Sequence, residues 1–465
     1  MISVLSQKFH AFQRSPGALE PSAGRTSGRR AAGTLRPLAA LSGGLLLTAA
    51  AMNAAGSDVE LGPRVETEPE TQAAQVIPRP VFDIPPLTLA IPVLDPGLPE
   101  NQEVWEDRGI WPELRRAEGV RCAQRIADAI NGLGHFESVI VAPDTTVSAD
   151  LYLLGTINAS NGEDLKIAYR LLDATGKTWI QKKTVRHRVP EGWHENNTNP
   201  QADPFEAVYA AIASDVEKSL AAQARRHAST VKQNAKRIAR GKSPKMSDLE
   251  KVALTRDLVL AGYFAPDRYG DALKQSGSRT KVQYVPYRDD EDWARIEAVS
   301  ARDTAFSKRL SDQYAAFADE MQGSYALWQQ DSFPYAREQR ILKERATAQG
   351  VLGALAAIAT VAAAADGDVG TLPTVAAGVA GTALIVSSFR TNNKRKRQVR
   401  QLNELGRSLQ AELAPSVVEL RESTVTLRGT AREQFQQWRS LLRDLYANDT
   451  EDIEAVTVVA ADIGA

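Results

Sequence analysis

Few side chains in this sequence are arranged in a way that could support catalysis. The densest carboxylate group is Asp289-Asp290-Glu291-Asp292, directly before Trp293. Clustered carboxylates can exchange protons or hold a cation, but acids are also typical of a first helical turn, where the helix dipole favours negative charge. Because an amphipathic pattern follows, we interpret this run as the start of a helix.

The remaining nucleophiles and metal ligands are sparse. His187 and His194 have a spacing that fits no helical pair of metal ligands. Cys122 is the single cysteine, so the chain has no internal disulfide and no four-cysteine metal site, and its helical context indicates a buried, inert thiol. Phosphate-binding glycine loops, zinc-protease motifs and serine-nucleophile motifs are all missing. We therefore predict no catalytic, cofactor-binding or metal-binding residues, and no enzyme.

Length and charge limit the classes of protein further. The chain has 465 residues, which indicates two to four domains, since a single core rarely exceeds about 300 residues. Its 56 basic and 57 acidic residues give a net charge of −1. This balance excludes a globally basic nucleic-acid coat and a globally acidic solvating chain.

The first 55 residues have the pattern of a secretory signal peptide or an N-terminal anchor. Residues 1–37 contain six basic residues and one acid, and an apolar run follows at residues 38–52. A buried alanine- and leucine-rich helix is the alternative. Residues 56–86 hold six prolines and form a linker to the next domain.

Residues 87–222 predict an α/β domain of about 135 residues. Apolar runs and alternation indicate strands, helical spacing of apolar residues indicates two helices, and ATGK at residues 174–177 indicates a hairpin turn. The expected order is β-α-β-β-β-β-α. The strands are expected at residues 87–94, 138–143, 149–157, 164–173 and 178–189, and the helices at 113–134 and 205–220.

Three motifs in this domain carry a resemblance to a known family. AIPVLDP at residues 90–96, ADLYLLGTI at 149–157 and RLLDATGK at 170–177 resemble a recurring bacterial envelope assembly domain. It occurs in the curli secretion channel lipoprotein, in the N-terminal domain of the Tol system periplasmic propeller protein and in flagellar outer-membrane accessory proteins. The resemblance implies a non-enzymatic role in envelope assembly, with envelope protein partners bound through residues 87–222. This chain departs from the curli channel because it lacks the lipid-anchor cysteine and paired barrel hairpins.

Residues 223–245 are basic and contain no acid. This segment either contacts anionic lipid, cell-wall polymer or nucleic acid, or is a solvated helix continuation and linker. No aromatic residue interrupts it, so we expect no nucleic-acid partner. The basic residues are Arg225, Arg226, Lys232, Lys236, Arg237, Arg240, Lys242 and Lys245.

Residues 246–446 are predicted to form a helical domain, followed by a C-terminal tail at 447–465. Ser247 begins a cap-like sequence, and Pro334 and Pro415 are expected to kink two long helical arms. The arms should pack in a coiled-coil-like seam. The first arm offers Phe306, Leu310, Tyr314, Phe317, Met321, Tyr325 and Trp328. The second offers Leu402, Leu405, Leu409, Leu413, Val417 and Leu420, then Phe435, Trp438, Leu441 and Leu445.

The arms are joined by an uncharged, glycine- and alanine-rich hairpin at residues 350–389. Gly350, Gly353, Gly378 and Gly381 lie where two helices could approach closely, as in a membrane glycine zipper. Each half is near the lower limit of about 17 residues for a transmembrane helix. We expect this hairpin to contact membrane lipid, with a buried alanine-rich hairpin as the alternative. Basic residues follow the hairpin, which conflicts with a periplasmic position of both ends.

Together these patterns predict an α+β protein, in which an N-terminal β-α-β-β-β-β-α domain precedes a long helical hairpin with a glycine- and alanine-rich tip. We expect a non-enzymatic assembly factor or scaffold of the cell envelope, exported to the periplasm and associated with a membrane that the sequence does not identify. Two alternatives stay open: a pore or secretion component that oligomerises through the glycine faces, and a cell-wall-active enzyme.

Overall fold

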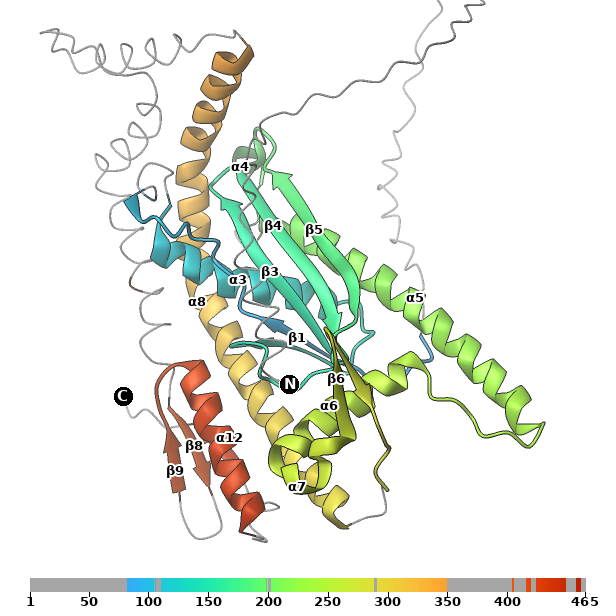
Figure 1. Ribbon diagram of the computed structural model, residues 1–465. Coiled ribbons are helices and arrows are strands. Elements are labelled where there is room, and N and C mark those ends of the chain that lie inside the picture. Colours follow the sequence, from blue (N-terminus) through green and yellow to red (C-terminus); the bar gives the residue numbers. More distant parts are fainter. Residues whose placement is uncertain are drawn as a thin grey trace, which may run out of the picture. The chain divides into compact units, whose positions relative to one another are not determined.

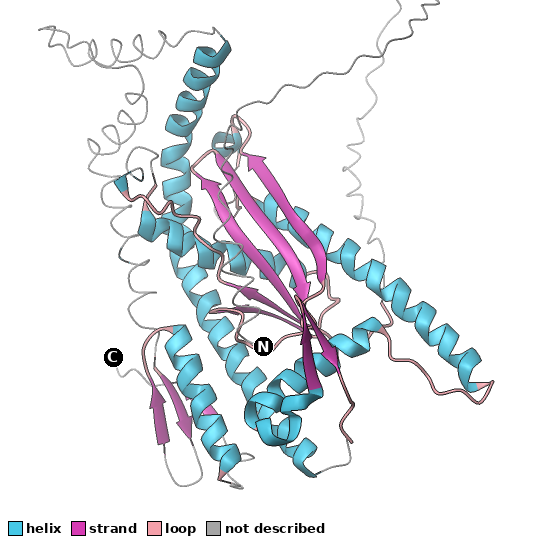
Figure 2. Cartoon of the chain, viewed as in Figure 1, coloured by secondary structure: helices cyan, strands magenta, loops and turns pink. Residues whose placement is uncertain are grey.

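The structure is a computed structural model that describes residues 82–287 except 104, 106–109, 198 and 200–201, then residues 291–348, 404, 415–419, 424–448 and 457–460. The signal-like segment 1–55 and the linker as far as residue 81 lie outside the described residues. So does the hairpin 350–389. The fold class is α+β, as predicted (Figures 1 and 2).

A mixed five-stranded sheet forms the first part of the protein. Its order is β2-β1-β3-β4-β5, with β1 parallel to β2 and β3, and with β3, β4 and β5 antiparallel. Helix α3 is the crossover from β1 to β2, and the short α4 and the long α5 follow β5, so the predicted order is confirmed apart from α4. The bounds are β1 Thr88–Pro92, α3 Pro112–Asn131, β2 Ser138–Ala142, β3 Leu151–Ser160, β4 Asp164–Asp173, β5 Thr178–Arg188, α4 Trp193–Asn196 and α5 Glu206–Ile238.

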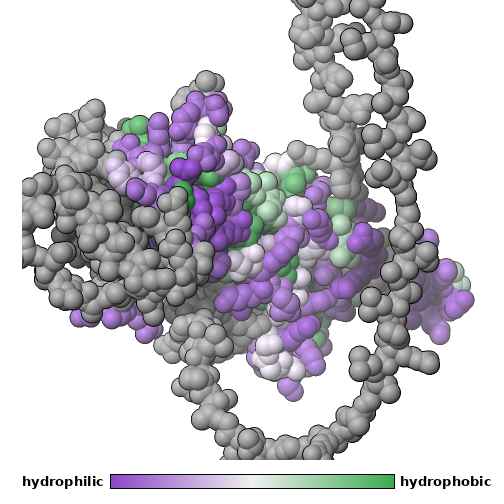
Figure 3. All heavy atoms as spheres, turned by 90° about the horizontal axis from the view of Figure 1, so that it is seen from above, coloured by the Kyte–Doolittle hydropathy of each residue, from purple (hydrophilic) through white to green (hydrophobic). Residues whose placement is uncertain are grey.

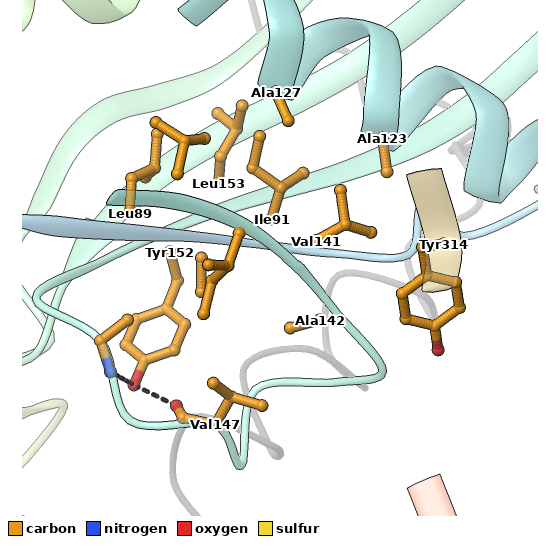
Figure 4. Close-up of a cluster of buried hydrophobic side chains, with 14 of the residues drawn as sticks. Leu89, Ile91, Ala123, Ala127, Val141, Ala142, Val147, Tyr152, Leu153 and Tyr314 are labelled. Atoms are coloured by element: carbon orange, nitrogen blue, oxygen red, sulfur yellow. Dashed lines mark hydrogen bonds between the residues drawn. The ribbon is translucent and has the colours of Figure 1, made fainter. Parts of the chain in front are cut away.

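The two faces of this sheet are buried for different reasons. On one face, Leu89 and Ile91 of β1 lie with Leu153 of β3 beneath Ala123 and Ala127 of α3 (Figure 4). All five residues of β1 are buried, as a central strand with apolar side chains on both faces requires. Helix α5 continues the helical layer over β4 and β5.

On the opposite face, Tyr152 is buried with its hydroxyl satisfied by the loop before β3. The hydroxyl donates to the Val147 carbonyl at 2.8 Å and accepts from the Ala149 amide at 3.1 Å (Figure 4). A buried phenol normally needs such partners, because an unpaired polar group in the interior is unfavourable.

Helix α8, Glu291–Ala348, runs along the edge of the sheet. It packs on β2 and α3, and the Ser311 hydroxyl accepts a hydrogen bond from the Val141 amide at 2.9 Å. Farther along, Gly162 in the β3–β4 turn meets the helix so closely that a Cβ atom would lie 2.2 Å from Ser332 Oγ and 2.5 Å from the Phe333 nitrogen. The helix thus covers the β2 edge, which would otherwise be open to pairing with another chain.

The remaining elements surround the other end of α8. The Ser247 side chain caps α6 in a capping box with Glu250, which confirms the predicted helix start. These elements are α6 Asp248–Phe264, α7 Pro266–Tyr269, η1 Gly270–Ala272, β6 Leu273–Ser276, β7 Arg279–Val282, β8 Ser416–Glu419, β9 Thr424–Leu427, α12 Ala431–Ala447 and β10 Thr457–Ala460. Strands β6 and β7 form a hairpin, and β10, β8 and β9 form a sheet in that order.

The predicted seam of α8 is buried at every one of its seven positions. Its partners, however, differ from the coiled coil that we expected. Phe306 stacks on Trp438 of α12 at 4.7 Å, whereas Tyr325 contacts Glu118 of α3. The seam therefore packs against α12 and the first domain.

The second arm also departs from a continuous helix. Val417 belongs to strand β8, so the helical prediction was wrong at this position. Neighbouring β-branched residues favour a strand there, and β8 pairs on both sides with β9 and β10. Leu402, Leu405, Leu409, Leu413 and Leu420 lie outside the described residues.

The prediction of a transmembrane helix is corrected for the part of the chain that the structure describes. No helix among those residues is both long enough and apolar enough to cross a membrane. The long helices α5 and α8 carry many charged residues, and purple, hydrophilic residues predominate among the coloured residues of Figure 3. The four glycines of the predicted hairpin, Gly350, Gly353, Gly378 and Gly381, lie outside the described residues.

Candidate functional site

The second half of α5 and the segment that follows it form the most unusual surface of the described chain. We call residues 225–245 the basic arm. In the first half of α5, Val208, Ile212, Val216 and Leu220 are fully buried. From Arg225 onward nearly every side chain is exposed, and Figure 1 shows this part of α5 extending beyond the sheet. The helix is therefore much longer than the predicted 205–220, and the interpretation of 223–245 as a helix continuation is confirmed as far as Ile238.

The arm carries positive charge without compensation. No acid occurs between Gln223 and Met246 in the sequence. Within the described residues, no carboxylate forms an ion pair with any of its eight cations. Like charges at helical spacing repel one another by a few tenths of a kcal/mol per pair. An anion that binds the arm would relieve this repulsion.

The arm is braced along its length. Gly241 turns the chain with φ of +69°, a conformation that favours glycine, and the chain then runs back along the helix. The Asn234 side chain donates to the Lys245 carbonyl at 2.7 Å and accepts from the Lys245 amide at 2.8 Å. Arg237 Nε donates to the Ser243 carbonyl at 2.9 Å. These bonds hold the helix and the returning segment together before any partner binds.

An apolar stripe accompanies the charges. Ala228, Val231, Ala235 and Ile238 follow one another at steps of three, four and three, and all four are exposed. Val231 is 51% and Ile238 60% exposed. The stripe continues the face that α5 buries in its first half. The stripe was not predicted because charge dominates this segment, although its heptad-like spacing is visible in the sequence.

The base of the arm joins helix α6 and an open groove. His227 Nδ1 lies 2.8 Å from the hydroxyl of Ser247, the residue that caps α6. Met246, just beyond the arm, lines a groove of about 660 Å³ between the β4–β5 turn, the start of α6 and strand β7.

A buried polar network between α3, α5 and α8 is the main cluster of titratable groups. Arg121 is fully buried, donates to Asp203 at 2.7 Å and to Gln322 at 2.9 Å, and lies over the Tyr325 ring at 4.2 Å. The Tyr325 hydroxyl donates to Glu118 at 2.8 Å. Burial raises the pKa of Tyr325 well above its ordinary value, so it stays a neutral donor. These contacts tie α8 to the first domain.

The thiol beside this network is inert. Cys122 is 1% exposed, and burial, followed by the charge of Glu118, raises its pKa to about 12. A thiolate is therefore scarce at neutral pH, and nucleophilic chemistry at this residue is not supported. The prediction of a buried cysteine is confirmed.

The other candidates from the sequence lie apart. His187 is in β5 and His194 in α4, where burial lowers the pKa of His194 and its ring lies edge-on to Phe333 at 5.2 Å. Glu291 and Asp292 occupy the first turn of α8, as predicted. Among the residues that the structure describes, no group of three histidines, cysteines or acids could hold a metal ion.

Comparisons of the chain with protein-family models, with curated proteins and with solved structures found no match. The basic arm therefore stands as the candidate site on its own geometry.

Proposed function

We propose that the protein is a non-enzymatic scaffold of the cell envelope that holds a partner protein through the basic arm. The observation that carries this proposal is the set of eight cations, without acidic partners in the described chain, on the end of α5 and the braced segment that follows it. Complementary charge speeds encounter and selects the partner. The arm is braced in advance, so little conformational entropy is lost on binding.

The apolar stripe favours an acidic amphipathic helix as the partner. A 3-4-3 spacing matches the seam of two packed helices, and the small Ala228 and Ala235 allow close approach. The same stripe is a poor fit to a bilayer interface, because only Val231 and Ile238 are large and neither is aromatic. A partner helix whose apolar residues match the spacing of the stripe would pack on it, and glutamates on either side of those residues would pair with the cations of the basic arm.

The rest of the molecule supports the role of a scaffold. The Arg121 network, the contact of Gly162 with α8 and the Asp303–Arg439 ion pair join elements that are far apart in sequence. A body held in this way can present the arm in a fixed direction. The resemblance of residues 87–222 to an envelope assembly domain supports the compartment.

The test uses a fluorescent three-heptad peptide with leucine at the seam positions and glutamate at the flanks. We expect the full-length protein to bind it, with an affinity that falls as salt rises. Lys232→Glu, Lys236→Glu and Lys242→Glu together should weaken binding by at least about tenfold, because charged side chains dominate recognition there.

A matched control variant reverses the charge of three exposed lysines outside the arm, by Lys166→Glu, Lys218→Glu and Lys308→Glu. It therefore changes the net charge of the protein by the same amount as the arm variant. It should bind the peptide much as the unmodified protein does. Equal loss in both triple variants would contradict the proposal, as would tighter binding to anionic phospholipid vesicles or to heparin than to the peptide.

A further inference from the structure

The groove at the base of the arm has the features of a second binding site. Its floor includes the apolar side chains of Met246, Val252, Val282 and Val285. Val285 is 54% exposed, and the adjacent Tyr287 is 73% exposed. Such contiguous exposed apolar residues are uncommon on a surface unless something binds there.

One wall of the groove is the outer edge of strand β7. The Gln283 amide donates to the Ala272 carbonyl at 2.9 Å, so the backbone of Gln283 faces the β6 side of the hairpin. In an antiparallel pair, alternate residues of a strand bond to the partner strand. The backbone N–H and C=O groups of Thr280 and Val282 therefore point away from β6. Thr280 shows this directly, since its amide donates to the Thr175 carbonyl of the β4–β5 turn at 2.9 Å. The edge thus already bonds one backbone carbonyl, from a turn, and Val282 is the next position along it that faces away from β6.

The two faces of β7 have opposite chemistry. Thr280 is buried and Val282 half-buried toward α6, whereas Arg279 and Lys281 are exposed on the other face. A strand added beside β7 would alternate in the same way. Its side chains would point in turn toward the apolar floor and toward the two cations.

The charges of the groove leave Arg279 and Lys281 available. Asp248 is engaged by Lys177 at 3.0 Å and by Lys251 at 3.5 Å. The oxygens of the other acid, Asp173, accept from the Thr175 hydroxyl, the Lys177 amide and the Trp179 indole. Arg279 and Lys281 form no ion pair within the described residues.

From this geometry we infer that the groove binds an extended peptide of a partner protein, in which apolar and acidic residues alternate. The peptide adds a strand to the β7 edge, its apolar residues contact Val252 and Val282, and its acids pair with Arg279 and Lys281. This site is distinct from the helix-binding surface of the basic arm, and either could exist without the other.

The test is fluorescence anisotropy of a labelled eight-residue peptide of alternating valine and glutamate, titrated with the full-length protein. Arg279→Glu with Lys281→Glu, both at exposed positions, should weaken binding by at least about tenfold. The arm variant with Lys232, Lys236 and Lys242 changed to Glu should bind as the unmodified protein does. N-methylation of one alternate set of peptide amides should abolish binding, and methylation of the other set should leave it intact, because only one set faces β7.

Four results of the peptide titrations would overturn the inference. They are no binding to the unmodified protein, unchanged binding by the Arg279/Lys281 variant, loss of binding in the arm variant, and equal effects of the two methylated peptides. Sedimentation of the protein alone tests a second copy as the occupant. A dimer that the Arg279/Lys281 variant dissociates would assign the groove to self-association and would also overturn the inference.

Discussion

Replacement of Gly162 by alanine tests the docking of α8 on the sheet. The new Cβ would meet Ser332 Oγ at 2.2 Å, the Phe333 nitrogen at 2.5 Å and the Gln329 carbonyl oxygen at 2.8 Å. Two of these three atoms belong to the α8 backbone, so the clash cannot be relieved by a side-chain rotation alone. Either the turn or the helix must shift.

The expected magnitude follows from two opposing terms. Overpacking a well-packed contact destabilises by about 1–3 kcal/mol. Alanine also lowers the conformational entropy of the unfolded chain, which raises the free energy of unfolding by about 0.4–1 kcal/mol. Gly162→Ala should therefore lower the free energy of unfolding by roughly 1–2 kcal/mol, a decrease in Tm of a few degrees.

The matched control is Gly323→Ala, in the interior of α8, where an added Cβ would meet nothing within 4 Å. This variant should be more stable by about 0.5–1 kcal/mol, because alanine is the better helix former. Urea unfolding followed by circular dichroism measures both. A Gly162→Ala protein as stable as the unmodified one would refute the close docking of α8.

Three further predictions concern buried groups. Asp303→Asn should lower the free energy of unfolding by about 3–5 kcal/mol, because it leaves the buried Arg439 without a charged partner. Replacement of both residues, Asp303 by Leu and Arg439 by Met, should recover most of the loss. Burial raises the pKa of Asp150 to about 6, against the opposing charge of Arg256. Between about pH 4 and pH 6 the folded protein therefore holds a proton on Asp150 that the unfolded chain has released. The contribution of Asp150 to the free energy of unfolding falls by on the order of 3 kcal/mol as pH rises through this range, and it is constant above pH 6. Asp150→Asn should remove that component from urea midpoints measured across this range, and an identical pH profile would contradict the assignment. Cys122 should resist a thiol reagent at pH 8 in the folded protein and react in urea; rapid labelling without denaturant would disprove its burial.

Local patterns were sufficient to predict the first domain. The apolar run of β1 indicated a strand, and the structure buries all five of its residues. The alternation in residues 164–173 and the turn after it predicted the β4–β5 hairpin, with β4 ending at Asp173 as expected. In this hairpin the two strands that pair are also consecutive in the sequence.

Long-range packing was not accessible in the same way. The spacing of Phe306 and Tyr325 identified a buried face of α8 but not its partners, since α12 and α3 offer equally apolar surfaces. Strand β8 was missed because four residues are too few to show a period, and its pairing with β10 joins segments about forty residues apart. The basic arm was recognised by its charge, but its brace depends on Asn234 reaching across to Lys245, which no local pattern reveals.

The central claim is that the basic arm receives an acidic helix, and hydrogen exchange tests it most directly. The amides of residues 225–238 lie in an exposed helix and should exchange readily in the free protein. Addition of the acidic three-heptad peptide should slow exchange in residues 225–245 while the buried strands β1 and β3 remain unchanged. Unaltered exchange across the arm at a saturating peptide concentration, or protection confined to another element, would contradict the account.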